Sequence, residues 1–107
     1  MSDYGIDRTK WAELSILEQM GNIGSEVGRA IENQKNGKLS RRNSAVDRAI
    51  DLFDATADAW ARKKSPRTKE ILRAKEQFLS LFFLHFDEDE AKGIERYFAQ
   101  FATAARQ

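Results

Sequence analysis

The sequence predicts an all-α protein, a single domain spanning residues 1–107 and built as a four-helix up-and-down bundle. Apolar residues recur at intervals of three and four in four long segments, which is the spacing of a helix that buries one face. The β-branched residues are few, and apolar and polar residues nowhere alternate over the length of a strand. A chain of 107 residues can bury one hydrophobic core but not two, so one domain is expected.

The first helix is predicted at residues 15–36. Ser15 and Glu18 form a capping-box pattern, in which each side chain accepts a hydrogen bond from the other residue's backbone N–H. Trp11 then lies in the loop that precedes the helix. A start near residues 7–9 is the alternative and would place Ser15 inside a longer helix. The predicted buried stripe of this helix consists of Ile16, Met20, Ile23, Val27 and Ala30.

The second helix is predicted at residues 40–64, with Ser40 as its N-cap. The third is predicted at residues 66–86, with Ser65 as the N-cap and Pro66 as the first helical residue. Proline is well tolerated at that position because the N–H that it lacks would have no partner in the helix.

The fourth helix is predicted at residues 88–106, where Asp87 and Glu90 form a second capping-box pattern. Gly93 weakens a helix interior, which leaves a start at Ile94 as the alternative. Connections of about three to six residues between helices of about 20 residues favour antiparallel neighbours, and hence the up-and-down arrangement.

The stretch from Phe78 to Phe86 is apolar on nearly every side of the predicted third helix. A small bundle leaves part of each helix facing outward, so this surplus of aromatic surface predicts contact with another subunit. We therefore expect a homo-oligomer formed through the third and fourth helices, and the alternative is that all of these side chains pack in the core. His85 lies among the phenylalanines and is expected in the core or at an interface rather than in catalysis.

Composition excludes several classes of site. The chain has no cysteine and one histidine, which rules out disulfides, thiolate nucleophiles and Cys/His metal clusters. Eighteen Lys and Arg against 17 Asp and Glu leave a formal charge of +1, so no overall field attracts nucleic acid or an anionic membrane. No apolar stretch approaches the roughly 20 residues that span a bilayer, and the N-terminal residues do not resemble a secretory signal. We expect a cytoplasmic protein that makes no membrane contact, and we assign no catalytic residue.

Three glycines, Gly21, Gly24 and Gly28, recur at intervals of three and four in the predicted first helix. Each costs about 1 kcal/mol of helix propensity relative to alanine, so a compensating role is expected. The favoured role is close approach of a neighbouring helix, and the alternative is a ligand lying against the bare backbone.

A polar stripe lies beside the apolar stripe of the same predicted helix. It is expected to be a solvated flank, with hydrogen bonds across a helix interface as the alternative. The stripe consists of Gln19, Asn22, Glu26 and Arg29.

A column of aspartates follows one face of the predicted second helix and consists of Asp47, Asp51, Asp54 and Asp58. The favoured interpretation is a solvated face whose charges pair with Arg48, Arg62 or the third helix, with no metal and no cofactor. The alternative is a divalent-metal-dependent nucleotide hydrolase, similar to the all-α NTP pyrophosphatases, with Mg²⁺ or Mn²⁺ as its cofactor. Its metal ligands would be Glu26, Asp51, Asp54 and Glu76.

Two basic clusters lie in the predicted connections. The first consists of Lys35, Lys38, Arg41 and Arg42, and the second of Arg62, Lys63, Lys64, Arg67 and Lys69. In an up-and-down bundle these connections lie at opposite ends, about 35 Å apart for a helix of about 23 residues. They cannot form one patch on a monomer, and no aromatic residue is interleaved with either for base stacking. Nucleic-acid binding is therefore not expected, although an RNA-associated accessory protein is kept as a second alternative function.

The predicted third helix carries charges of alternating sign at Lys69, Glu70, Arg73 and Glu76. The favoured interpretation is a salt-bridged seam that sets helix register, with Arg73 and Glu76 reaching Asp51 or Glu26. The alternative is an anion-binding site centred on Arg73.

Several segments resemble a family of short, uncharacterised bacterial and archaeal helical proteins that share an EQMxNIGSEVxRA-type segment. They are EQMGNIGSEVGRA at 18–30, RAIDLFD at 48–54, KEILRAKE at 69–76, YFAQF at 97–101 and AAR at 104–106. The resemblance implies a compact helical protein with a shared polar set, and it brings no function. That set, the candidate binding residues, consists of Asn22, Ser25, Glu26, Arg29, Arg48, Asp51, Arg73 and Glu76.

The function predicted from these features is a small helical-bundle binding or assembly module that associates with itself and possesses no catalytic signature. A protein partner other than itself is compatible with the same features.

Overall fold

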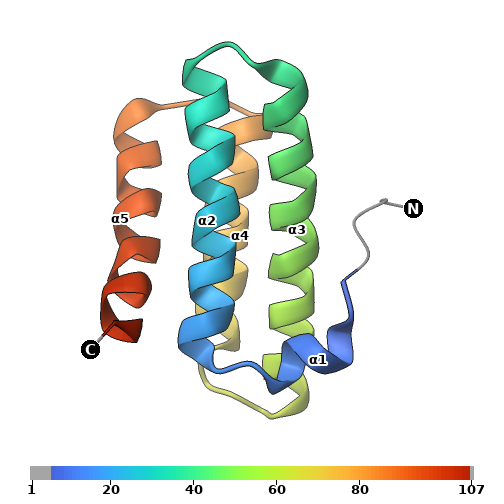
Figure 1. Cartoon of the computed structure of the whole chain (residues 1–107). Helices are drawn as coiled ribbons and strands as arrows, with labels where there is room; N and C mark the ends of the chain where they lie inside the picture. The colour runs from blue at the N-terminus through green and yellow to red at the C-terminus, as the bar shows by residue number, and fades with distance from the viewer. Residues whose placement is uncertain (1–5, 107) are drawn as a thin grey trace.

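The computed structural model describes residues 6–106, and within that range it is all-helical, as predicted (Figure 1). Residues 1–5 and 107 of the predicted domain lie outside the described residues. The sequence predicts four helices, whereas the described range contains five. They are α1 (Arg8–Glu13), α2 (Ile16–Lys35), α3 (Leu39–Arg62), α4 (Thr68–Phe83) and α5 (Glu88–Ala105). The four long helices run alternately up and down in Figure 1.

The additional helix α1 corrects the prediction that Trp11 lies in a loop. Asp7 caps α1 by accepting hydrogen bonds from the backbone N–H groups of Thr9 and Lys10. The backbone becomes extended at Leu14, so α1 does not continue into α2 as the alternative prediction required. The predicted capping box of Ser15 and Glu18 is present and begins α2.

The bounds of α4 differ most from the prediction. The helix begins at Thr68 rather than Pro66, because Ser65 starts a turn in which Thr68 donates to its carbonyl oxygen and Arg67 to its side chain. It ends at Phe83 rather than residue 86, since the backbone leaves regular helical geometry at Leu84. The start of α5 at Glu88, capped by Asp87, excludes the alternative start at Ile94.

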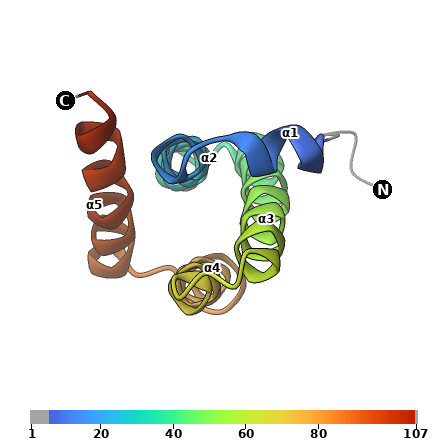
Figure 2. The same ribbon diagram turned by 90° about the horizontal axis from the view of Figure 1, so that it is seen from below.

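Packing is uneven around the molecule. Helix α2 packs extensively against α3 on one side and α5 on the other, whereas α5 approaches α4 at few points. In Figure 2, α2 and α4 are seen nearly end-on, while α5 lies obliquely beside them. In the core the ring of Phe53 lies 5.6 Å from that of Phe78 and 6.0 Å from that of Phe98. The core therefore joins α3, α4 and α5 through aromatic contacts.

The close approach predicted for the glycines is confirmed at Gly24. A Cβ atom there would lie 2.8 Å from the Cβ of Phe98 on α5, closer than two carbon atoms can pack. A Cβ at Gly21 or Gly28 would meet no described atom within 4 Å. Only the middle glycine of the three is explained by the α2–α5 contact.

A buried polar network fixes α1 against α2 and α3. Gln19, only 1% exposed, donates from Nε2 to the carbonyl oxygen of Trp11 (2.9 Å) and accepts at Oε1 from the indole of Trp60 (2.8 Å). The indole of Trp11 donates to the hydroxyl of Thr56 (2.8 Å), which donates to the carbonyl of Leu52 (2.7 Å). Gln19 therefore bridges a helix interface, and the prediction of a solvated flank is wrong at this residue.

Candidate functional site

The structure brings together three members of the predicted polar set, Glu26, Arg29 and Arg48. Glu26 on α2 is 7% exposed. Its Oε2 accepts from Nε of Arg48 on α3 at 2.7 Å, and its Oε1 accepts from Nη1 of Arg29. A buried carboxylate requires such pairing, since removing a charge from water is costly unless opposite charges and hydrogen bonds compensate. The cluster links α2 to α3.

The remaining polar residues of α2 make only local contacts. The side chain of Asn22 donates to the carbonyl of Glu18 at 2.9 Å, and Ser25 donates to the carbonyl of Gly21 at 3.2 Å. Both residues are exposed. These bonds within one helix turn do not place the two side chains in a shared site.

The metal-ligand set proposed from the sequence does not converge. Both oxygens of Glu26 already accept from guanidinium groups, and Asp54 pairs with Lys75 on α4 at 2.6 Å. In the part of the chain that the structure describes, no three His, Asp or Glu residues are placed to hold one metal ion. Two of the four carboxylates of the α3 column have basic partners: Asp54 pairs with Lys75, and Asp58 lies 3.3 Å from Arg62, consistent with the predicted paired face at these two positions. Arg73 and Glu76 do not reach Glu26, whose partners are Arg29 and Arg48.

A cluster that the sequence analysis missed joins the start of α4 to α5. The guanidinium of Arg67 donates to both oxygens of Glu70, from Nε at 3.1 Å and from Nη2 at 2.8 Å. The hydroxyl of Tyr97 on α5 donates to the same carboxylate. The Arg67 guanidinium also lies over the rings of Trp60 (5.9 Å) and Phe101 (5.5 Å), so cation–π contacts hold it in place.

The electrostatics of this cluster follow from those contacts. The hydrogen bond from Arg67 lowers the pKa of Glu70, and the same bond raises the pKa of Arg67. Burial, together with the hydrogen bond to Glu70, raises the pKa of Tyr97 well above its usual value of 10.0. At neutral pH the cluster therefore holds a compensated ion pair and a neutral phenol. Because Tyr97 is 27 residues from Glu70, no local pattern in the sequence indicates their contact.

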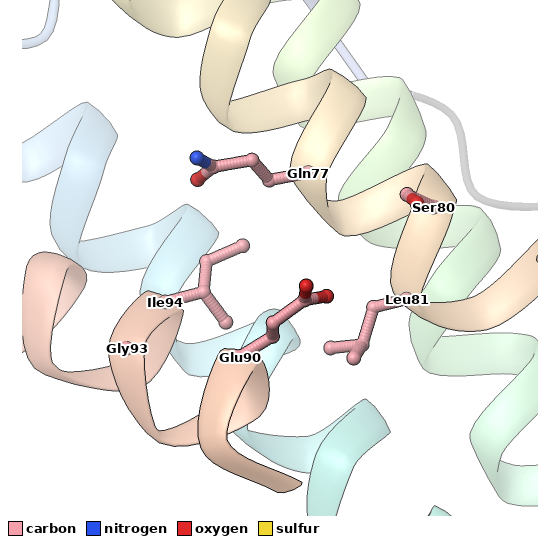
Figure 3. A pocket seen from close by; sticks show the side chains of 6 residues that line it. All are labelled: Gln77, Ser80, Leu81, Glu90, Gly93 and Ile94. Carbon is pink, nitrogen blue, oxygen red and sulfur yellow. The ribbon is translucent and has the colours of Figure 1, made fainter. Parts of the chain in front are cut away.

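Two hollows lie between α4 and α5, where the two helices are poorly packed. The hollow nearer the α4–α5 connection, which we call the upper hollow, has a volume of about 430 Å³. It is lined by Gln77, Ser80 and Leu81 of α4 and by Glu90, Gly93 and Ile94 of α5 (Figure 3). The hollow nearer the start of α4, which we call the lower hollow, has a volume of about 390 Å³. It is lined by Lys69, Glu70, Arg73, Ala74, Gln77 and Tyr97. Gln77 borders both, so the hollows follow one another along the α4–α5 seam.

The aromatic surface expected on the third and fourth helices is smaller than predicted. Phe78, Phe98 and Phe101 are buried in the core. The exposed part is the segment 82–86, which we call the apolar corner: Phe83 is 64% and Leu84 is 83% exposed, while Phe82 and Phe86 are half-buried. His85, expected in the core or at an interface, is also exposed, so it does not lie in the core, and its place at an interface stays a prediction.

Comparison with protein-family models, curated proteins and solved structures found no match to this chain. Within residues 6–106, none of the helices is both long and apolar enough to cross a membrane.

Proposed function

We propose that the chain is a helical-bundle binding and assembly module that associates with a second copy of itself through the end of α4 and the start of α5. In this proposal the four long helices act as an up-and-down four-helix bundle, and the module works in the cytoplasm without a metal or cofactor. The absence of cysteine supports that location, because secreted domains of this size commonly depend on disulfides. The observation that carries the proposal is the exposure of Phe83 and Leu84 in the apolar corner.

Burial of the apolar corner supplies the driving force. Transferring a Phe or Leu side chain from water into an interface contributes about 1.5–3 kcal/mol, and a two-fold interface buries each side chain twice. Association itself costs about 4–15 kcal/mol in lost freedom of motion. The two quantities are of similar size, so burial of the apolar corner offsets the cost of association. A dimer that forms at tens of micromolar needs about 6 kcal/mol beyond that, which the contacts around the corner must supply.

Charge at the same end of the molecule supports a second copy as the partner. The α2–α3 turn and the α4–α5 connection lie at one end (Figure 1). Four basic residues lie in this turn and the adjoining ends of α2 and α3, within 35–42, and four acidic residues at 87–90 lie at the end of the connection and in the first turn of α5. A two-fold interface requires a self-complementary surface, and this arrangement sets the basic turn of one copy against the acidic segment of the other.

The test is sedimentation velocity between 5 and 100 µM, comparing the wild type with the double variant Phe83→Ser/Leu84→Ser. We expect a concentration-dependent dimer in the wild type and a monomer in the variant. The matched control is Ile16→Ser, which changes an exposed apolar residue at the opposite end of the molecule. A wild-type protein that stays monomeric at 100 µM contradicts the proposal, as does an equal loss of dimer in both variants.

A further inference from the structure

The lower hollow between α4 and α5 has features of a small-molecule site. Its volume of about 390 Å³ lies within the range of roughly 300–1,000 Å³ typical of ligand pockets. Two of its lining residues have apolar groups: Ala74, which is 5% exposed, and Tyr97, which is half-buried. The remaining lining residues are charged or polar, so a ligand there would meet apolar contacts and oriented donors together.

A column of hydrogen-bond donors borders the hollow along α4. Lys69, Arg73 and Gln77 are spaced four residues apart, which places them one above another on a single helix face. Neither Lys69 nor Arg73 has an ion-pair partner among residues 6–106. Like charges four residues apart destabilise a helix, and a bound anion would convert that repulsion into attraction.

The acid beside this column does not neutralise it. Among the described residues that line the lower hollow, Glu70 is the only acid. Both of its oxygens accept hydrogen bonds from Arg67, and one of them also accepts from Tyr97. The charge of Glu70 is therefore balanced by Arg67, a residue outside the lining. The two charges left uncompensated at the hollow are those of Lys69 and Arg73.

Two uncompensated positive charges indicate the chemistry of the ligand. A phosphomonoester carries a charge of about −1.5 to −2 at pH 7, whereas a carboxylate carries only −1. Guanidinium groups bind phosphate oxygens with two parallel hydrogen bonds, and an ammonium group adds a mobile point charge. A phosphate group alone would leave much of the hollow unfilled, which leaves space for an apolar or planar remainder against Ala74 and Tyr97.

We propose that the lower hollow binds a small organic phosphomonoester, whose phosphate is held by Lys69 and Arg73 and whose remaining part lies against Ala74 and the ring of Tyr97. This site is separate from the apolar corner and does not depend on self-association. Gln77 completes the donor column and supplies a neutral hydrogen bond at the end of the hollow nearest the upper one.

Helix α5 offers a matched control. Lys92 and Arg96 are also exposed cations spaced four residues apart, but they line neither hollow. The double variants Lys69→Gln/Arg73→Gln and Lys92→Gln/Arg96→Gln therefore remove the same charge from helices of the same molecule. A general attraction of anions to the protein would weaken equally in both variants.

The experiment titrates ¹⁵N-labelled full-length protein with phenyl phosphate, inorganic phosphate and benzoate, following backbone amide shifts. We expect saturable shifts around Ala74 and Tyr97 with phenyl phosphate, and weaker binding of the other two ligands, which lack either the ring or the second charge. Loss of charge-assisted hydrogen bonds in Lys69→Gln/Arg73→Gln should weaken phenyl phosphate binding roughly tenfold or more. The control variant should stay within about twofold of the wild type, since screening at physiological salt limits distant charges to small effects.

Three results would overturn the proposal. The first is the absence of saturable shifts at the hollow in a wild-type protein whose thermal melt shows it to be folded. The second is equal weakening in the two double variants. The third is tight, steeply salt-dependent binding of a single-stranded RNA without any response to phenyl phosphate, which would assign the basic residues to a nucleic-acid surface instead.

Discussion

The contact between Gly24 and Phe98 predicts that one substitution, made at three positions of the same helix, will have opposite effects. Replacing glycine with alanine inside a helix contributes about 1 kcal/mol of propensity wherever the added methyl group is accommodated. At Gly21 and Gly28 the new Cβ meets no described atom within 4 Å. We therefore expect Gly21→Ala and Gly28→Ala to raise the free energy of unfolding by about 0.5–1 kcal/mol each.

At Gly24 the same methyl group would lie 2.8 Å from the Cβ of Phe98 and 3.4 Å from its Cγ. A Cβ is fixed to its own backbone, so no rotamer change of Phe98 relieves the overlap and α5 must shift away from α2. Overpacking of a core costs about 1–3 kcal/mol, and the helix propensity of alanine offsets about 1 kcal/mol of it. We expect Gly24→Ala to lower the free energy of unfolding by up to about 2 kcal/mol.

Urea denaturation followed by circular dichroism measures all three variants on one scale. A change of 1 kcal/mol corresponds to a shift of about 4–8 °C in melting temperature for a domain of this size, so thermal melts give a second reading. The reasoning is refuted if Gly24→Ala is as stable as Gly21→Ala, because α2 and α5 would then not be in close contact at this point. Destabilisation by all three substitutions would also contradict it, since open space is assigned to the outer two.

Three further predictions concern the buried network, the ion pair and metal binding. Gln19→Ala should lower the free energy of unfolding by about 1–3 kcal/mol, measured by urea denaturation, because it leaves the buried indole N–H of Trp60 without a partner. The carbonyl of Trp11 loses the bond from Gln19 and keeps the one from the backbone N–H of Leu14. Because the pKa of Glu70 is lowered, its contribution to stability is present above its ordinary pKa of 4.5 and is lost as pH falls through the folded-state value. In thermal melts at acidic pH, Glu70→Gln should therefore lose less stability than the wild type does as the pH is lowered. Millimolar Mg²⁺ should not raise the melting temperature, and Asp51→Asn should behave as the wild type does, whereas a rise that Asp51→Asn abolishes would revive the metal-dependent hydrolase.

Local patterns in the sequence predicted most of the helices. The capping box at Ser15 and the cap at Asp87 are formed by residues three positions apart, so the sequence contains all of the information needed to place them. The start of α4 was misplaced because Ser65 satisfies its hydrogen bonds in a turn before the helix begins. The short helix α1 was missed because its stability depends on burial of Trp11 against α3, which is a tertiary contact.

The candidate site was predicted less well, for a physical reason. The sequence places Glu26 in a polar set, but its partner Arg48 is 22 residues away. Arg48 is instead expected to form an ion pair with an aspartate of its own helix. The contact of Tyr97 with Glu70 depends on how α5 lies beside α4, and α5 is also packed closely on α2 at Gly24, where there is no side chain. Periodicity shows which face of a helix is buried but not which residues of another helix meet it.

The two proposed binding surfaces should be independent of each other, and this prediction follows from the length of α4. Arg73 and Phe83 are ten residues apart on one helix, which corresponds to about 15 Å at 1.5 Å per residue. That separation exceeds the screening length of about 8 Å at physiological ionic strength, so a charge change at one end has little effect at the other. Both surfaces have the same origin, since α5 packs closely on α2 at Gly24 and covers α4 only in part.

We expect Phe83→Ser/Leu84→Ser to remove dimerisation while phenyl phosphate binding stays within about twofold of the wild type, and Lys69→Gln/Arg73→Gln to do the reverse. Sedimentation velocity and the amide titration, applied to both double variants, measure this directly. Loss of both activities in either variant, with the thermal melt unchanged, would mean that the dimer interface extends along α4 into the hollow. The apolar corner and the donor column would then be parts of one surface.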